Sequence, residues 1–499
     1  MYKKYFLGVD IGTTAVKTML VDSNGQELAL QRHEHSVYRS QPLWAEEKPE
    51  DWWKGFKLTA RKVENNSGIN LGEISGIGIC NLCTSLVVLS SNGEPLYPAI
   101  IWNDRRSFEQ AESLKNIYKK NNWLSQLGPI DSGEASVTSL LWLIQNKPIA
   151  MKNAWKFVHA NGYIGYKLTG RATMDASNAS KTGLFNKESA SWNSSALSAL
   201  GIDKLVPDYC LSHEIIGGVS RQVANETGLK PGTPVVIGGT DTSCATLGAG
   251  VIALGQVLES TGATGVLTSH LTRWIRDDRL NSKCSIIPGL WLTGGGSSGT
   301  GLSLQWALDN LGFMESAKII HSCLDPYKLM DELALQSPVG SNGIIFLPYL
   351  GGKRTIIHNP VAKGAFIGLD FSHNKSDLVR SILEGTVFEL REVFDTLEEV
   401  SVKIREIRSA GGGAKSDVWR QIKSDIFGCP IYTPVVNESA SFGAAMLAAI
   451  GTGYFKSFEE AVKAWVKLKP KYSEPDRTKH EQYKEYFSLF KEYYNKLFS

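Results

Sequence analysis

The stretch Gly238-Gly239-Thr240-Asp241-Thr242-Ser243 lies almost at the midpoint of the chain. An apolar β-branched run, Val235-Val236-Ile237, precedes it and is typical of a buried strand. The two glycines are expected to end that strand and to present the carboxylate of Asp241 at its tip, facing a crevice. Asp241 is therefore our candidate for the chemistry. The alternative interpretation is a simple turn, in which Asp241 caps the helix that follows.

Length and composition indicate a soluble globular protein that acts on small molecules. A chain of 499 residues is long for a single core and predicts two or three domains. The net charge of +3, without a long basic run, favours neither nucleic acid nor an anionic membrane as a partner. Residues 1–6 lack the apolar core of a signal peptide, and the tract from Val235 to Leu258 is too interrupted to span a membrane. We expect a cytoplasmic protein whose seven scattered cysteines are reduced thiols.

A second strand that ends in a carboxylate opens the chain. Tyr5 to Asp10 predicts a buried strand, and Gly12-Thr13-Thr14 turns it back into a second strand near Lys17. Such a Gly/Thr turn offers backbone N–H groups and hydroxyls to a phosphate, and an adjacent aspartate can hold the accompanying metal ion. Asp10 is thus a metal candidate, and Thr13, Thr14 and Lys17 are phosphate candidates. A plain hairpin turn is the alternative.

The segment Trp102-Asn103-Asp104-Arg105-Arg106 combines an aromatic plate, an amide, an acid and two bases. Hydroxyl-rich ligands need such a mixture, because an apolar face allows stacking and planar polar groups fix the directions of hydroxyls. The structural alternative is the start of a helix, with Asp104 as its cap and both arginines in solvent. The polar segment from Thr173 to Leu184 is expected to be a loop whose side chains line a cleft.

The opening pattern of strand, Gly/Thr turn and strand returns in the second half. Gln256 to Ser260 and Val266 to Thr268 predict strands on either side of the turn Thr261 to Gly265. This repetition suggests two related lobes, each of which supplies one phosphate loop. Further on, glycines in Ala410 to Ser416 would let a flat base lie against the backbone between a strand and a helix. A small-residue helix from Glu438 to Ala449 is expected to pack behind that loop.

Together these motifs resemble the FGGY family of carbohydrate kinases, within the actin-like ATPase superfamily, and the resemblance covers nearly the whole chain. The C-terminal signature of the family fits at every constrained position, from Gly364 to Leu369 and on through Asp377 to Glu384. The N-terminal signature departs from the family at Ser139, where a lysine is usual. Within the family the chain is most similar to xylulokinases, but Leu82-Cys83-Thr84 stands where these carry Met-His-Gly.

The resemblance implies an α/β protein of two actin-like, ribonuclease-H-like lobes with a central cleft for ATP and sugar. It places the N-terminal lobe at residues 1–245 and the C-terminal lobe at 246–499, and the packing of the last helix, 478–498, stays open. It implies ATP and Mg²⁺ as cofactors, with Asp10 at the metal and Asp241 as the catalytic base. It places the nucleotide at Thr13, Thr14, Lys17, Thr264, Gly265, Gly412, Gly413 and Ala414. It places the sugar at Cys83, Thr84, Trp102, Asn103, Asp104 and Asp241.

The implied activity is ATP-dependent phosphorylation of a small sugar or sugar derivative. A ketopentose is the first expectation, and a polyol, an aldonate or a deoxy sugar are alternatives. A homodimer is one option for the oligomeric state. A different class of function is an actin-like ATPase that acts as a chaperone or structural protein and phosphorylates no small molecule. A dinucleotide-binding oxidoreductase ranks last, because no G-x-G-x-x-G follows the first strand.

Overall fold

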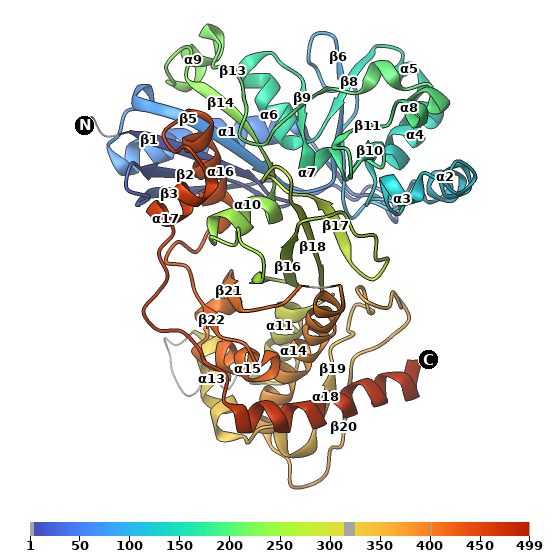
Figure 1. Cartoon of the computed structure of the whole chain (residues 1–499), viewed down its shortest axis with the longest axis vertical. Coiled ribbons are helices and arrows are strands. Elements are labelled where there is room, and N and C mark those ends of the chain that lie inside the picture. The colour runs from blue at the N-terminus through green and yellow to red at the C-terminus, as the bar shows by residue number, and fades with distance from the viewer. Residues whose placement is uncertain (1–3, 314–324, 401, 499) are drawn as a thin grey trace.

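The computed structural model describes residues 4–313, 325–400 and 402–498, and these form two lobes joined at a waist (Figure 1). Each lobe is built around a six-stranded sheet. The first sheet has the order β13-β14-β5-β1-β2-β3. Its strands are β1 (Tyr5–Ile11), β2 (Ala15–Asp22), β3 (Glu27–Glu34), β5 (Ile74–Asn81), β13 (Ile215–Gly218) and β14 (Pro234–Thr240). Within the described ranges, no helix has the length and apolar character that a membrane crossing requires.

The central strands of the second sheet repeat the connectivity of the first sheet, and the edge strands differ. The second sheet has the order β17-β18-β16-β15-β21-β22. Its strands are β15 (Gln256–Thr261), β16 (Gly265–Leu271), β17 (Asn281–Cys284), β18 (Trp291–Gly296), β21 (Glu406–Ala410) and β22 (Ile431–Tyr432). The hairpin β1–β2 pairs in parallel with β5, just as the hairpin β15–β16 pairs in parallel with β21. The two related lobes predicted from the repeated strand-turn-strand pattern are therefore present.

Helices and a smaller four-stranded sheet surround the first sheet. The four-stranded sheet has the order β4-β7-β6-β8. Its strands are β4 (Glu46–Glu47), β6 (Ser85–Ser90), β7 (Ala99–Ile101) and β8 (Ala154–Val158). The helices of this lobe are α1 (Pro49–Ser67), α2 (Phe108–Lys120), α3 (Leu124–Leu127), α4 (Ser136–Asn146), α5 (Pro148–Met151), α6 (Ala160–Thr169), α7 (Ala176–Ala179), α8 (Ser194–Leu200), α9 (Arg221–Thr227) and α10 (Asp241–Gly248). Short strands β9 (Thr173–Asp175), β10 (Phe185–Asn186), β11 (Ser191–Trp192) and β12 (Asp208–Cys210) complete it.

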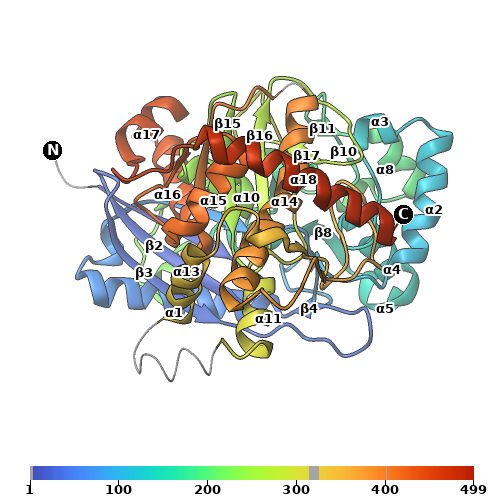
Figure 2. The same ribbon diagram turned by 90° about the horizontal axis from the view of Figure 1, so that it is seen from below.

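The second lobe is closed from below by helices, as Figure 2 shows. They are α11 (Thr300–Asn310), α13 (Pro326–Gln336), α14 (Lys375–Glu399), α15 (Asp417–Phe427) and α18 (Arg477–Phe498), with β19 (Ile345–Leu347) and β20 (Ala365–Ile367) beside them. The amphipathic pattern at the C-terminus accounts for α18, since Tyr483, Phe487, Phe490 and Tyr494 are buried in the core of this lobe. The packing of the last helix, left open by the sequence, is thus on α14, α15 and β19.

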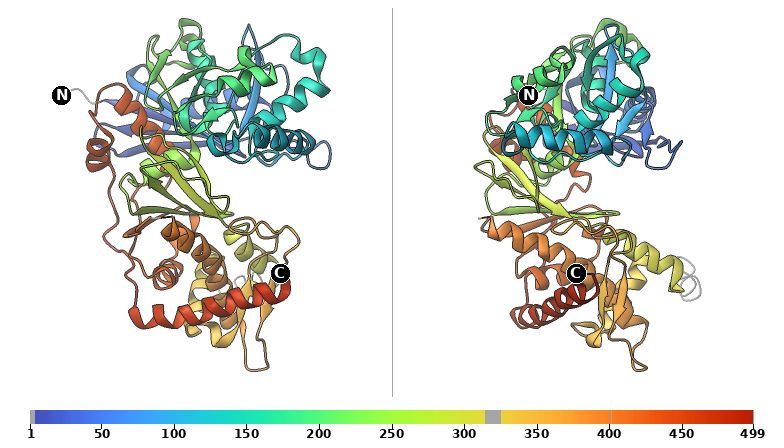
Figure 3. Two further views of the ribbon diagram at one scale, coloured as in Figure 1. Left: turned by 45° about the vertical axis from the view of Figure 1, so that its right-hand side comes forward. Right: turned by 90° about the vertical axis from the view of Figure 1, so that its right-hand side faces the viewer.

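The chain returns to the first lobe before it ends. Helices α16 (Ser439–Gly451) and α17 (Phe458–Trp465) lie beside β1, β2 and β3, while α18 lies at the opposite end of the molecule (Figures 1 and 3). A Cβ at Gly8 would overlap the carbonyl oxygen of Ser441, and a Cβ at Gly443 would overlap that of Cys244. Small residues thus allow α16 to approach β1 and α10 at backbone distance. The domain boundary at 245/246 stays a prediction.

Four local expectations differ from the structure. The glycines before Asp241 do not end their strand, because β14 runs on to Thr240 with an irregular register between Val236 and Gly239 and a positive φ of 73° at Gly238. The sequence from Phe157 to Leu168 has a helical pattern, but the helix starts at Ala160, since Phe157 still pairs in β8. The segment 173–184 is a buried hydrogen-bonded network rather than a cleft-lining loop. Helix α16 packs mainly on the first sheet and α10, not behind the loop at 410–416.

Candidate active site

Asp241 is the first residue of α10, directly after β14. The bulge at Gly238 turns the end of this strand, and the backbone N–H of Thr240 donates to the hydroxyl of Ser177 over 2.9 Å. That hydroxyl in turn donates to the carboxylate of Asp175 over 2.5 Å. Oδ1 of Asp241 accepts the N–H of Thr242 over 2.6 Å, whereas Oδ2 accepts no hydrogen bond from any residue that the structure describes. One oxygen of a half-buried carboxylate is therefore held, and the other is available to a ligand.

Asp10 lies at the same edge of the sheet. In the register of the three parallel strands, both Asp10 on β1 and Gly239 on β14 lie opposite Cys80 on β5. Burial raises the pKa of Asp10 to about 6, the nearby Lys17 opposes that rise, and the charge of Asp241 adds to it. The structure thus brings together the two carboxylates that the sequence singled out, which are 231 residues apart in the chain.

The predicted phosphate residues of the first lobe surround this edge. Thr13 and Thr14 form the turn between β1 and β2, and the side-chain hydroxyl of Thr13 accepts the indole N–H of Trp102 over 3.2 Å. Lys17 Nζ lies 3.7 Å from an oxygen of Asp10 and 2.6 Å from one of Glu438, next to the start of α16. Lys17 is therefore tied to two carboxylates, and its contact with phosphate remains a prediction.

Two loops of the second lobe are packed against each other. The turn that holds Thr264 and Gly265 joins β15 to β16, and the N–H of Gly265 donates to Ser297 over 3.0 Å. The loop with Gly412, Gly413 and Ala414 follows β21, and a Cβ at Gly413 would lie 2.7 Å from the side chain of Thr261. Beneath them, the fully buried Lys423 donates to Glu259 over 2.8 Å and to Thr261 over 3.0 Å. A buried ion pair thus fixes the two predicted nucleotide loops relative to each other.

The predicted sugar segment has mixed surroundings. Trp102 is half-buried, and the guanidinium carbon of Arg354 from the second lobe lies 5.4 Å from the centre of its ring. Asn103 keeps a buried side-chain oxygen without a hydrogen-bond partner among the described residues. Thr84 donates to the carbonyl oxygen of Gly133 over 2.7 Å, and burial raises the pKa of the Cys83 thiol to about 12. Trp102, Asn103 and Cys83 therefore retain groups that could meet a ligand.

Asp104 is fully buried, and its carboxylate is occupied within the protein. Oδ2 accepts from the backbone of Ala45 over 2.6 Å and from the guanidinium of Arg106 over 2.7 Å. Arg106 also donates to Glu46 over 2.7 Å and is itself buried. The helix-cap alternative with solvated arginines is wrong for Arg106, because the pair forms a buried bidentate ion pair and α2 begins only at Phe108. A direct contact of Asp104 with sugar remains a prediction.

Lys283 was missed by the sequence reasoning. It lies on β17 of the second sheet, and its Nζ donates to the hydroxyl of Thr240 over 2.7 Å, next to Asp241. Burial lowers its pKa, and the negative charge of Asp241 opposes this shift. Its local sequence, Ser282-Lys283-Cys284, carries no motif, so only the path of the second sheet reveals the contact.

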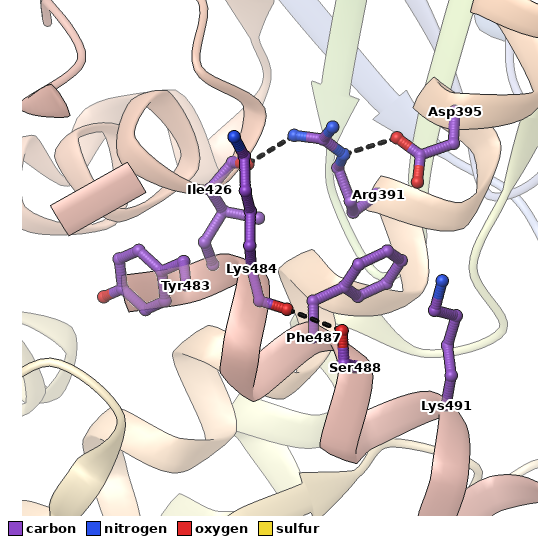
Figure 4. A pocket seen from close by; sticks show the side chains of 8 residues that line it. All are labelled: Arg391, Asp395, Ile426, Tyr483, Lys484, Phe487, Ser488 and Lys491. Carbon is purple, nitrogen blue, oxygen red and sulfur yellow. Dashed lines mark hydrogen bonds and ion pairs between the residues drawn. The ribbon is translucent and has the colours of Figure 1, made fainter. Parts of the chain in front are cut away.

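Two surface pockets formed by the described residues lie away from these side chains. One, of about 230 Å³, lies between α14, α15 and α18, where Arg391 pairs with Asp395 (Figure 4). The other, of about 680 Å³, is lined by His213, Ile287 and Phe455, among others. Both are open depressions without a convergent set of catalytic groups.

Comparison with known proteins places this arrangement in a family. The model of the N-terminal domain of the FGGY family of carbohydrate kinases matches residues 5–248, and the model of its C-terminal domain matches residues 261–452. A xylulose kinase from Staphylococcus epidermidis is 31% identical over 498 residues, covering 99% of this chain and 97% of the relative. A gluconokinase from Bacillus subtilis is 30% identical over 462 residues, covering 91% of this chain and 89% of the relative.

A solved structure agrees with the sequence comparisons. The gluconate kinase from Lactobacillus acidophilus superimposes with a TM-score of 0.89 at 26% identity and covers 100% of this chain and 99% of its own. The predicted α/β fold with two sheet-containing, actin-like lobes is thereby confirmed. The chain belongs to the FGGY family of carbohydrate kinases and is an ATP-dependent carbohydrate kinase.

Proposed function

We propose that this protein transfers the γ-phosphoryl group of ATP to a hydroxyl of a small sugar or sugar derivative, with Asp241 as general base. The observation that carries this proposal is the position of Asp241, whose free oxygen Oδ2 lies at the strand edge that also holds Asp10. The acceptor would lie mainly on the first lobe, against Trp102, Asn103 and Cys83. The names of the relatives, xylulose kinase and gluconokinase, support a ketose or a sugar acid as the acceptor.

In the proposed step, the acceptor oxygen forms a bond to the γ-phosphorus, and the bond from that phosphorus to the bridging oxygen of ADP breaks. The proton of the acceptor hydroxyl passes to Oδ2 of Asp241. A base of this kind contributes roughly 10²- to 10⁴-fold to a rate. Because the transition state of phosphoryl transfer is loose and highly charged, positioning contributes most of the remaining rate enhancement. Thr13, Thr14 and Thr264 would position the phosphates from the two lobes.

The residues at this edge also fit a magnesium ion. No cluster of three or more metal-ligating side chains occurs in the described parts of the chain. Mg²⁺ needs no such cluster, since it keeps several waters and is commonly held by one or two carboxylates together with substrate phosphates. Asp10, buried and with its pKa raised to about 6, is a carboxylate that a cation would stabilise in its charged form. When bound, the ion would neutralise charge on the phosphates, and Asp10 would hold it directly or through water.

A coupled ADP-release assay tests this function, with ketopentoses, polyols, aldonates and deoxy sugars as the panel of acceptors. We expect ADP release to depend on one acceptor class. ATP turnover that is independent of every acceptor would instead support the alternative of an actin-like ATPase with a chaperone or structural role.

Among neutral acceptors, D-xylulose should be poor. Leu82-Cys83-Thr84 lacks a histidine that could hydrogen-bond a sugar hydroxyl, and the Cys83 thiol is a weak substitute. Loss of one such partner in a buried site costs ~1–3 kcal/mol. A large preference for D-xylulose in kcat/KM would contradict this inference and leave the kinase activity intact.

A further inference from the structure

Lys283 places a positive charge beside the proposed base without an ion-pair partner. Its Nζ donates to the neutral hydroxyl of Thr240 over 2.7 Å. In the described portion of the chain, none of the lysine ion pairs involves Lys283. No carboxylate oxygen of those residues therefore lies within 4.0 Å of its Nζ. A buried charge without a counter-charge is costly, so a ligand that supplies the counter-charge would be favoured.

The groups around Lys283 do not neutralise it. The Cys83 thiol stays protonated, because burial raises its pKa to about 12. Asp175 is fully buried and accepts hydrogen bonds from Asn161, Ser177 and Asn178. A second cation nearby, Lys181, pairs with Glu134 over 3.1 Å and supplies no counter-charge for Lys283. Asp241 is the remaining anion, and in the proposed mechanism its free oxygen accepts the proton of the acceptor hydroxyl.

The charge also lies on the acceptor side of Asp241. Thr240, which accepts from Lys283, is linked through Ser177 to Asp175. Lys181 donates to Asn281 on the same strand as Lys283 over 3.2 Å and pairs with Glu134, next to the carbonyl of Gly133 that accepts from Thr84. Asp10, at the phosphate side, instead contacts Lys17 and Cys80. Lys283 therefore lies toward the segment of Cys83 and Thr84, a predicted acceptor contact, rather than toward Asp10 and the phosphate turn.

A purely structural role is the competing explanation. Lys283 could serve only to hold Thr240, and thereby Asp241, from across the waist. A neutral donor would make that hydrogen bond without the cost of burying a charge. The hydroxyl of Thr240 is also held by its own hydrogen bond to Ser243 over 2.8 Å, and the backbone of Thr240 is held by Ser177. Holding Thr240 in place therefore does not explain why the residue at position 283 carries a positive charge.

We propose that Lys283 binds the carboxylate of the acceptor, so that the preferred substrate is a sugar acid of the aldonate class. This inference rests on the proposed function and narrows it. The sequence led first to a neutral ketopentose as the expected acceptor, and this inference replaces it with an anionic sugar acid of similar size. Lys283 is then a specificity-determining residue that the second lobe contributes to an acceptor site otherwise built on the first lobe.

The test compares acceptors that differ only in the carboxylate. The measured quantity is the ratio of kcat/KM for D-gluconate to that for D-glucitol, and likewise for D-xylonate and xylitol, in the coupled ADP-release assay. D-xylulose is included as a neutral ketose. For the wild-type enzyme we expect the acid of at least one pair to exceed its neutral partner by about tenfold or more, since hydrogen bonds to charged groups are worth ~1.5–3 kcal/mol.

Variants then assign the preference to Lys283. Lys283→Met should lower the acid-to-neutral ratio by roughly 10- to 150-fold, and Lys283→Arg should keep most of it. Lys181→Met is the matched control, because its charge is already paired with Glu134, and it should change the ratio by less than about threefold. Lys283→Gln, which keeps a donor for Thr240, provides a second neutral variant if the methionine variant is unstable.

The outcomes separate this inference from the proposed function. A ratio that falls in both neutral variants and is kept by arginine supports the sugar-acid acceptor. Equal losses for acids and neutral acceptors, or a wild-type enzyme that prefers the neutral partner, overturn it and leave the kinase intact. Phosphorylation of no acceptor of either charge overturns both.

Discussion

At the scale of single residues, the negative charge of Asp10 is expected to set how strongly the site binds Mg²⁺. Asp10→Asn keeps the shape of the side chain and removes the negative charge next to Lys17. Sugar-dependent turnover should fall most at low Mg²⁺ and recover partly as Mg²⁺ rises, because oxygen ligation by the carboxylate is weakened. Steady-state rates over a magnesium titration measure this. An unchanged dependence on Mg²⁺ would reduce Asp10 to a residue that shapes the turn.

Lys187 allows a second residue-scale prediction, away from the site. Burial lowers its pKa from 10.5 to about 7, and no hydrogen bond or ion pair of its ammonium occurs among the described residues. The ring of Trp274, 4.8 Å away, favours the charged form and limits the shift. Between pH 7 and about 10.5 the unfolded chain holds a proton that the folded chain has lost. Wild-type stability due to this residue therefore rises with pH in that window.

Lys187→Met should thus be more stable than the wild type, most clearly at or below pH 7. Its advantage in the free energy of unfolding should shrink by at most about 1.4 kcal/mol per pH unit as pH rises toward 10. Denaturant unfolding at pH 6.5, 8 and 9.5 measures this, with the exposed Lys152→Met as control. An advantage that does not change with pH would show that Lys187 titrates normally in the folded protein.

Residues with a local signal could be found from sequence, and those with only distant contacts could not. Asp10 and Asp241 follow apolar strands and precede Gly/Thr or Thr/Ser turns, so the pattern itself marks a strand end. Glu438 contacts Lys17, which is 421 residues away in the chain, and Lys283 contacts Thr240, which is 43 residues away. No motif next to Glu438 or Lys283 in the sequence predicts these contacts.

At the scale of elements, α16 is the segment whose position depends most on small residues. A Cβ at Gly443 would overlap the backbone carbonyl of Cys244 on α10, which cannot move without displacing the helix that begins at Asp241. Gly443→Ala should lower stability by ~1–3 kcal/mol, as overpacking does. Gly351→Ala is the control, because a Cβ there meets open space. Similar midpoints of thermal unfolding for the two variants would contradict the close packing of α16 on α10.

Helices and strands could be predicted where the spacing of apolar residues and the turn residues indicate the same structure, as in the hairpins β1–β2 and β15–β16. Prediction failed where buried polar residues hydrogen-bond one another. The segment 173–184 was expected to be a cleft-lining loop because Asp175, Ser177 and Asn178 are polar, yet all three are fully buried. The family signature also has a structural part, since Glu384 on α14 is buried and accepts from Arg380 and Tyr483.

At the scale of the whole molecule, the two lobes must approach each other for the chemistry. Thr13 and Thr14 lie on the first lobe and Thr264 on the second, and all three are proposed to contact one chain of phosphates. Across the waist, Arg354 makes an exposed ion pair with Glu134 at 3.3 Å. Strands β17 and β18 also contact the first lobe, through Lys283 on Thr240, the N–H of Cys284 on Ser180 over 3.0 Å and the indole of Trp291 on the carbonyl of Lys187 over 2.7 Å. The exposed ion pair contributes little to holding the lobes together.

Closure should therefore accompany binding of both ligands and exclude water from the γ-phosphate. Small-angle scattering should give a smaller radius of gyration with an acceptor plus a non-hydrolysable ATP analogue than with either ligand alone. Saturation by both ligands without contraction would count against two lobes that close on the phosphates. The relation between the lobes was predictable only from the repeated pattern and the family resemblance, because no local motif encodes the waist.

The central claim is that Asp241 takes the proton of the acceptor, and a single-turnover measurement tests it most directly. Asp241→Asn preserves the hydrogen bond to the N–H of Thr242 and removes the basic oxygen. With the best acceptor of the panel and limiting labelled ATP, the rate of phosphoryl transfer should fall by roughly 10²- to 10⁴-fold while the affinity for ATP stays nearly unchanged. A transfer rate in the variant equal to that of the wild type would remove Asp241 from the mechanism.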